Sequence, residues 1–132
     1  MARKKALSAS PYEEKIGFSR ASRIGYMIAV SGTAPIAEDG STAYPGDAYK
    51  QTKRCFKIIA EALIKCGGSL SDIIRTRIYV TDMSKWQEIG KAHGELFAEI
   101  KPASTLVEVN KLVRDDWLVE IEADAIVKVE DD

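Results

Sequence analysis

Three carboxylates stand at alternate positions of one stretch near the end of the chain. Glu120, Glu122 and Asp124 alternate with apolar residues over residues 118–129. This period of two predicts a long β-strand with the carboxylates on one face and an apolar row on the other. Neighbouring carboxylates on a strand repel one another unless cations or water screen them. The acidic face is therefore either solvated, which the pattern alone favours, or it lines a polar site or a subunit contact.

Two further sets of residues could do chemistry. Arg75 and Arg77 could bind an anion, but pairing with carboxylates on a neighbouring strand is the simpler interpretation. His93 could form a hydrolase triad with Ser31 or Ser104 and an aspartate. The chain has no Gly-x-Ser-x-Gly motif, however, and a position in the middle of a predicted helix favours a packing or surface role for His93.

Cysteine and histidine are scarce, which limits metal and redox chemistry. Cys55 and Cys66 belong to one predicted helix, where a rise of ~1.5 Å per residue separates them by about 16 Å. A disulfide needs Cα atoms within about 7 Å, so we expect two free, buried thiols and a reducing, cytoplasmic location. With one histidine and no Cys-x-x-Cys pattern, we expect no metal site.

The length of 132 residues is that of a single domain, which we expect to span residues 1–132. The net charge of −1 gives no general attraction to nucleic acid or to an anionic membrane. No apolar run approaches the ~20 residues of a membrane span, and the N-terminus lacks an apolar signal segment. Residues 1–15, with a basic cluster at residues 3–5, are expected to form a solvated N-terminal arm.

The order of periodic segments predicts an α+β fold. Crossovers through two helices give one mixed sheet with both helices on one face. The other face is then uncovered and half-apolar, which makes it a candidate oligomer surface. In chain order the predicted elements are strands 16–24 and 26–31, helix 48–66, strand 73–80, helix 84–99, and strands 102–109 and 118–129, that is β-β-α-β-α-β-β.

Local signals mark the ends of the two helices. Asp47 is a candidate N-cap of the first helix, which the Gly-Gly pair at residues 67–68 ends. Ser84 and Gln87 have the spacing of a capping box for the second helix. Trp86 is expected to anchor that helix in the core.

Four motifs give the chain a resemblance to a known family. They are Ser31-Gly32, residues 75–82 (RTRIYVTD), Pro102-Ala103 and residues 119–123 (VEIEA). Together they resemble the Rid/YjgF family, the reactive intermediate deaminases. The resemblance implies a chorismate-mutase-like fold and a homotrimer with its sites in the clefts between subunits. It also implies hydrolysis of a small-molecule imine or enamine, such as 2-aminoacrylate, without a cofactor.

The resemblance also implies roles for individual residues. Glu120 matches a glutamate that positions or activates the attacking water. Backbone near Ser31 and Gly32 helps to line the substrate pocket. All three are therefore site candidates.

The chain departs from the family where active members carry an arginine for the substrate carboxylate. An arginine fork matches a carboxylate bidentately, but Ser104 stands at this position. A hydroxyl cannot neutralise an anion, and hydrogen bonds to charged groups are each worth about 1.5–3 kcal/mol. Leu106 replaces a cysteine of some members, and Phe18 and Arg20 lie where others carry a tyrosine motif. These four are substrate-binding candidates, and Arg20 or Arg23 could supply the missing charge.

Three functions follow from this pattern. The first is a related hydrolase or deaminase of an imine- or enamine-like metabolite that uses Glu120, because Ser104 argues against 2-aminoacrylate deamination itself. The alternative is a non-catalytic trimer that binds a metabolite. The third is an endoribonuclease-like activity, which the near-neutral charge argues against.

Overall fold

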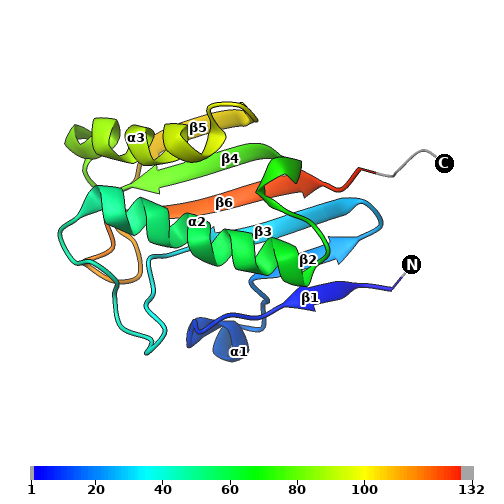
Figure 1. Ribbon diagram of the computed structural model, residues 1–132. Coiled ribbons are helices and arrows are strands. Elements are labelled where there is room, and N and C mark those ends of the chain that lie inside the picture. The colour runs from blue at the N-terminus through cyan, green and yellow to red at the C-terminus, as the bar shows by residue number, and fades with distance from the viewer. Residues whose placement is uncertain (1, 129–132) are drawn as a thin grey trace.

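The computed structural model describes residues 2–128 (Figure 1). Its strands are β1 (Lys4–Ala6), β2 (Ala21–Ile24), β3 (Met27–Thr33), β4 (Ile73–Val80), β5 (Ala103–Glu108) and β6 (Val119–Ile126). Its helices are α1 (Tyr12–Ile16), α2 (Ala48–Lys65) and α3 (Trp86–Phe97), and the 3₁₀ turns are η1 (Leu70–Asp72) and η2 (Met83–Lys85).

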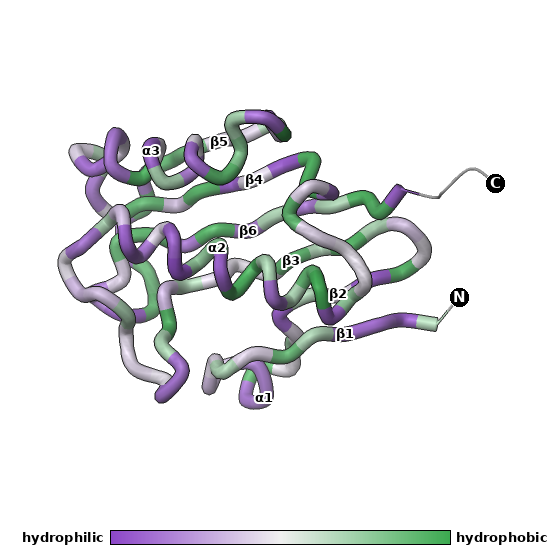
Figure 2. Tube along the Cα trace, viewed as in Figure 1, coloured by the Kyte–Doolittle hydropathy of each residue, from purple (hydrophilic) through white to green (hydrophobic). Residues whose placement is uncertain are grey.

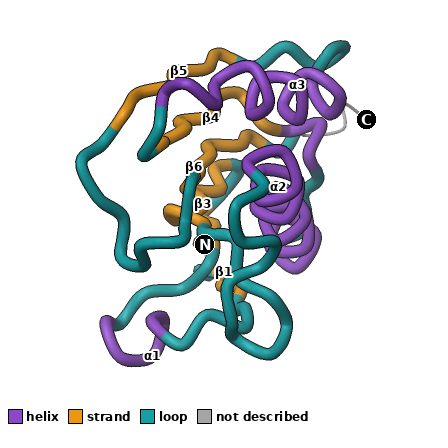
Figure 3. Tube along the Cα trace, turned by 90° about the vertical axis from the view of Figure 1, so that its left-hand side faces the viewer, coloured by secondary structure: helices purple, strands orange, loops and turns teal. Residues whose placement is uncertain are grey.

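All these strands belong to one mixed sheet in the order β1-β2-β3-β6-β4-β5. β4 and β5 run parallel, whereas the other neighbours are antiparallel. α2 connects β3 to β4, and α3 connects β4 to β5, so each helix is a crossover. Figure 3 shows both helices on the same side of the sheet. The prediction of an α+β fold with one mixed sheet and two helices on one face is confirmed.

β6 lies between β3 and β4 and has two chemically different faces. The face toward the helices is apolar and buried, as the alternation predicts, and it carries Val119, Ile121, Ala123 and Ala125. The intervening carboxylates alternate with these residues and are half-buried. Val129, the last residue of the predicted strand, lies outside the described residues.

Arg77 of β4 pairs with two of these carboxylates. Its Nη1 lies 3.1 Å from Asp124 Oδ2 and 3.6 Å from Glu122 Oε1. Tyr79 of the same strand donates a 2.7 Å hydrogen bond to Glu122 Oε1. The cross-strand pairing predicted for Arg77 is confirmed, whereas Glu120 has no ion pair with any residue in the described range.

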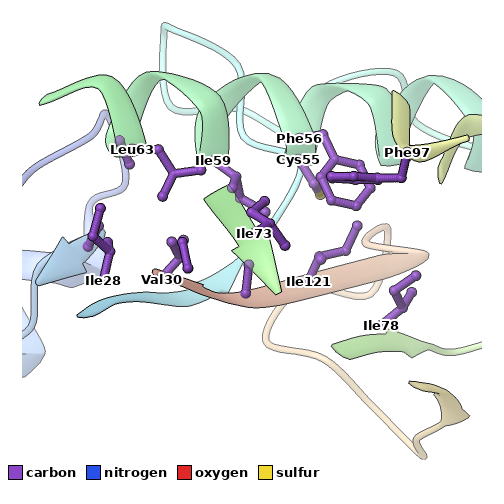
Figure 4. Close-up of a cluster of buried hydrophobic side chains, with 14 of the residues drawn as sticks. Ile28, Val30, Cys55, Phe56, Ile59, Leu63, Ile73, Ile78, Phe97 and Ile121 are labelled. Carbon is purple, nitrogen blue, oxygen red and sulfur yellow. The ribbon is translucent and has the colours of Figure 1, made fainter. Parts of the chain in front are cut away.

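The main core lies between α2 and the sheet (Figure 4). One face of α2 and its C-cap residue is buried, and its members are Ala48, Thr52, Cys55, Phe56, Ile59, Leu63 and Cys66. Phe56 packs edge-on against Phe97 of α3, with ring centroids 5.1 Å apart, so both helices share this core. In Figure 2, apolar and polar segments alternate along α2, as expected for a helix that buries one side.

α2 begins and ends where its local signals predict. The Asp47 side chain accepts a 2.9 Å hydrogen bond from the Lys50 backbone N–H, which is N-cap geometry. Gly67 follows the helix with a φ of 85°, a left-handed conformation that glycine adopts without a steric cost.

The N-terminal segment differs from the expected arm over residues 1–15 and strand over residues 16–24. β1 pairs with β2 at the sheet edge, α1 follows, and β2 begins only at Ala21. The reason is tertiary, because Glu13 of α1 and Arg20 are buried together as an ion pair. No periodicity in the sequence marks such a pair.

The second helix also starts differently from the prediction. The capping box of Ser84 and Gln87 does not form; instead the Asp82 side chain accepts a 3.0 Å hydrogen bond from the Ser84 backbone N–H and opens η2. The Ser84 hydroxyl donates a 2.6 Å hydrogen bond to the same Asp82 oxygen, so it does not cap the helix. Trp86 is 53% exposed, so the expectation that it anchors the core is wrong, and Ile89 is buried instead.

Both cysteines lie in the interior of the fold. Cys55 and Cys66 are free and buried, which confirms the prediction of two free thiols. Burial raises the pKa of the Cys55 thiol, so it is not a reactive thiolate. Within residues 2–128, no helix combines the length and the apolar composition that a membrane span requires.

Ile59→Ala is expected to lower the free energy of unfolding by about 2–5 kcal/mol, because it removes a fully buried side chain between α2 and the sheet. The matched control is Ile64→Ala on the same helix, whose side chain is 67% exposed. This control should change stability by less than about 0.5 kcal/mol. Urea denaturation measures both values, and equal losses would contradict the assigned buried face of α2.

Candidate active site

A cavity of about 820 Å³ lies at the end of β3. Its walls come from the N-terminal segment, the end of β3, one side of α2, and β6. Apolar side chains make up much of the lining, among them Leu7, Ile16, Phe18, Ile58, Val113 and Trp117. Four residues predicted from the sequence meet here: Phe18, Arg20, Gly32 and Glu120.

The best-buried charges of the site are Arg20 and Glu13, whose side chains are 4% and 5% exposed. Arg20 Nε lies 3.3 Å from Glu13 Oε2. The Ser8 backbone N–H donates a 3.0 Å hydrogen bond to Glu13 Oε1, and the Ser8 hydroxyl bonds to Glu13 Oε2. A buried ion pair is stable only when its remaining polar atoms are also hydrogen-bonded, and Ser8 meets this need for Glu13.

Arg20 also ties the N-terminal segment to the end of β3. Its Nη1 donates hydrogen bonds to the Gly32 carbonyl oxygen and, at 3.2 Å, to Thr33 Oγ1. The ring of Phe18 lies beside the guanidinium, with its centroid 5.3 Å from Cζ. With Nε bound to Glu13, the N–H groups on Nη2 have no hydrogen-bond partner among residues 2–128. They are available to a ligand in the cavity.

Glu120 brings a carboxylate into the cavity from β6. A Cβ at position 32 would clash with Glu120 Oε2, so Gly32 makes the room that this carboxylate needs. Burial raises the pKa of Glu120; Arg20 partly offsets this rise, and the Glu122 carboxylate adds to it. A carboxyl group with a raised pKa holds a proton more readily than an ordinary glutamate, which suits it to proton transfer.

Sequence reasoning missed Glu13, Ser8 and Arg54 as parts of the site. Arg54 lines the cavity, and its Nε donates a 2.8 Å hydrogen bond to the Ile36 carbonyl oxygen. Arg54, Ile58 and Ala62 follow one another at helical spacing, so this second stripe of α2 was a usable signal for the cavity wall. Nothing in the sequence marks Glu13 or Ser8, because their role depends on burial beside Arg20.

The structure does not bring every predicted site residue to the cavity. Ser31 lies next to Gly32, but its Oγ donates a 2.7 Å hydrogen bond to the Ser19 carbonyl oxygen. Ser104 and Leu106 lie on β5, which β4 separates from β6. Within one protomer they do not line this cavity, so their part in substrate binding stays a prediction.

The alternative source of positive charge lies outside the cavity. Arg23, the alternative to Arg20 as a source of positive charge, donates a 2.8 Å hydrogen bond to the Cys66 carbonyl oxygen at the end of α2 and does not line the cavity. In the described part of the chain, no three or more His, Cys, Asp or Glu side chains group in a way that could hold a metal ion.

Comparison with known proteins assigns the family. The family model described as "Endoribonuclease L-PSP" matches residues 8–127. The crystal structure of Rv2704 from Mycobacterium tuberculosis, a member of the YjgF/YER057c/UK114 family, is 41% identical, with a TM-score of 0.85. The match covers 96% of this chain and 100% of that chain. This chain belongs to the YjgF/L-PSP family.

Two sequence relatives support the same membership. The protein SCO2049 of Streptomyces coelicolor is 37% identical over 119 residues, which is 89% of this chain and 87% of that protein. The 3-aminoacrylate deaminase RutC of Acinetobacter baylyi is 34% identical over 101 residues, which is 76% of this chain and 79% of that protein. The resemblance to the Rid/YjgF family inferred from four motifs is confirmed, as is the α+β fold of that family.

Glu13→Gln is expected to lower the free energy of unfolding by about 3–5 kcal/mol, because it leaves the Arg20 charge buried without its partner. Glu14→Gln is the matched control, since it makes the same change at an exposed neighbouring position of α1. Chemical denaturation measures both variants. A loss for Glu13→Gln no larger than that for Glu14→Gln would contradict the role of the ion pair.

Glu120→Gln is expected to gain stability relative to the wild-type protein as the pH rises from acid to neutral. Burial raises the folded-state pKa of Glu120, so the stability it contributes is present below the unfolded pKa and is lost as the pH rises through the folded pKa. The amide cannot ionise and does not lose this contribution. Thermal unfolding across this pH range tests the prediction; a constant difference between the two proteins would contradict it.

Proposed function

We propose that this protein hydrolyses an imine- or enamine-like metabolite in a cleft between subunits, without a cofactor. The observation that carries the proposal is the half-buried Glu120 carboxylate, which lies over Gly32 in a largely apolar cavity that Arg20 also lines. The relative from Acinetobacter baylyi is named a 3-aminoacrylate deaminase, and 3-aminoacrylate is itself an enamine.

In this proposal, Glu120 moves protons between water and the substrate nitrogen. Glu120 accepts a proton as the water oxygen forms a bond to the imine carbon, and it passes that proton to the nitrogen to give a carbinolamine. A second proton moves from the new hydroxyl to the nitrogen, the C–N bond breaks, and ammonia leaves. The balance is imine plus water to carbonyl compound plus ammonia, so no cofactor is consumed.

Arg20 is the proposed anchor for an anionic group of the metabolite. Its free Nη2 N–H groups are held in place because Nε and Nη1 are bound to Glu13, Gly32 and Thr33. Glu13 neutralises much of the Arg20 charge, so this anchor works mainly through directed hydrogen bonds. Arg54 adds a second positive charge to the lining.

The size and lining of the cavity favour a metabolite with an apolar side chain. A cavity of about 820 Å³ is within the range of pockets that enclose drug-sized ligands. Phe18, Ile58, Val113 and Trp117 offer apolar surface on several sides. Burial of an apolar substrate group against them contributes to the binding free energy about 25 cal/mol for each Å² of apolar surface removed from water.

We also propose that the chain forms a homotrimer through the uncovered face of the sheet. Met27, Val107 and Ile126 are exposed apolar residues on β3, β5 and β6, and a neighbouring subunit would cover them. In such an assembly, Ser104 and Leu106 of a neighbouring subunit complete the cleft. The free cysteines fit the cytoplasmic location that we propose.

A non-catalytic trimer that binds a metabolite is the second candidate. Ser104 favours it, because a hydroxyl holds a substrate carboxylate less firmly than the arginine of active relatives. RNA cleavage is a third candidate, because the matching family model is described as an endoribonuclease. The net charge of −1 argues against it, because RNA binding rests on contacts between cations and phosphates.

The test is hydrolysis of imines that an amino acid oxidase generates in situ from alanine, leucine or phenylalanine. The wild-type protein should accelerate formation of the keto acid, and the leucine and phenylalanine imines should react faster than the alanine imine. Glu120→Gln should lose roughly 100-fold or more of this rate, the range expected for a general acid–base group. Glu122→Gln, which removes the next carboxylate of β6, is the control and should keep the activity.

No acceleration of any imine by the wild-type protein would overturn the hydrolase. Thermal stabilisation by a keto acid would then favour the binding trimer. RNA cleavage that Glu120→Gln abolishes would instead favour the nuclease.

A further inference from the structure

The cavity extends along α2, well beyond the corner that holds Glu120. Arg54, Ile58, Ala62 and Lys65 of this helix all line it. Residues 54 and 65 are eleven positions apart. At a rise of ~1.5 Å per residue, this wall is about 16 Å long. A small imine beside Glu120 would therefore fill only part of the cavity of about 820 Å³.

Charged groups gather at the Arg54 end of this wall. Burial raises the pKa of the neighbouring Cys55 thiol, and the Glu120 carboxylate adds to this rise. Arg20 and Arg54 oppose the rise, so all three charges act on the same turn of α2. The two cations make this end of the cavity suitable for an anionic group.

Arg54 has hydrogen-bond donors that the fold does not use. It is half-buried, and its Nε donates a 2.8 Å hydrogen bond to the Ile36 carbonyl oxygen. Among residues 2–128, its Nη1 and Nη2 N–H groups have no hydrogen-bond or ion-pair partner. Besides Glu120, the lining has two carboxylates, Glu38 and Glu61, and both are exposed. Arg54 can therefore bind a carboxylate of a ligand and keep its bond to Ile36.

Beyond Arg54 the wall of α2 is apolar as far as Lys65. Ile58 and Ala62 are buried residues of this stretch, which we call the α2 arm of the cavity. At its end, Lys65 Nζ donates a 2.9 Å hydrogen bond to the Leu7 carbonyl oxygen and holds the N-terminal segment beside the helix. Leu7 and Ile16 line the cavity although they are 62% and 71% exposed. A ligand that covers such side chains removes apolar surface from water, which favours binding.

We propose that the α2 arm binds an unbranched aliphatic carboxylate of medium chain length. Its carboxylate lies on the Nη groups of Arg54, and its alkyl chain runs past Ile58 and Ala62 toward Leu7. Charge complementarity fixes the head, and the long apolar wall fits an extended chain better than a compact group. This ligand class differs from the imines of the proposed function, and its binding does not require hydrolysis.

Chain length is the first test, measured by isothermal titration calorimetry with hexanoate, octanoate, decanoate and dodecanoate below their micelle-forming concentrations. The dissociation constant should fall by up to about fourfold for each added methylene, the factor that complete burial of one CH₂ gives. Decanol and decylammonium have the same chain without the anion and should bind more weakly than decanoate. No binding of any carboxylate, an affinity independent of chain length, or equal binding of decylammonium and decanoate would overturn the proposal.

The position of the carboxylate is the second test. Arg54→Gln should weaken decanoate binding about tenfold or more, the loss of hydrogen bonds to a charged group, and Arg54→Lys should restore part of the affinity. Lys57→Gln is the control, because Lys57 is an exposed cation of the same helix that does not line the cavity. Equal decanoate affinity for Arg54→Gln and Lys57→Gln would overturn the proposed head site.

The path of the chain is the third test. Leu7→Asp places a charge beside the end of the chain and should weaken dodecanoate binding about tenfold or more, because the alkyl end cannot solvate a carboxylate. Hexanoate ends before Leu7 and should bind as it does to the wild-type protein. Ile64→Asp makes the same change at a residue of α2 that is 67% exposed and does not line the cavity. Equal dodecanoate affinity for the two variants would overturn the assigned path.

These results are separable from those of the imine test. Decanoate binding through Arg54 without imine hydrolysis would keep this inference and remove the catalytic function. Imine hydrolysis without decanoate binding would keep the proposed function and remove this inference.

Discussion

The buried ion pair between Arg20 and Glu13 is the interaction on which the candidate site depends. A buried guanidinium without a partner would cost several kcal/mol, so Glu13 and its Ser8 contacts must be in place for the N-terminal segment to pack. Once the pair is formed, Arg20 also binds the Gly32 carbonyl oxygen and Thr33. One side chain therefore holds the N-terminal segment against the end of β3 and closes one wall of the cavity.

β6 gives the site its carboxylate as a consequence of the alternation that builds the core. Its apolar row must face the helices, and a slip by one residue would exchange the two faces of the strand. Glu120 is therefore fixed on the face away from the core row. The missing side chain at Gly32 leaves space for its carboxylate, and limited access to water raises its pKa.

The proposed site would bind an anion differently from a site with an arginine after the Pro-Ala motif. An arginine there would attract any carboxylate, whereas the neutral Ser104 hydroxyl would not. In the proposed function the positive charge comes from Arg20, which Glu13 partly neutralises. Together with the apolar lining, this arrangement favours a metabolite that is held by its side chain as much as by its charge.

The sequence by itself determined the sheet, the two crossover helices, the family and the strand face on which Glu120 lies, because periodicity, helix caps and short motifs are local properties. It did not reveal β1, α1, the cavity wall that Ser8 and Arg54 line, or the pairing of Glu13 with Arg20. Those features depend on which charged side chains become buried next to each other, and residues far apart in the chain decide that. The α2 arm of the cavity likewise exists only where the N-terminal segment packs beside α2.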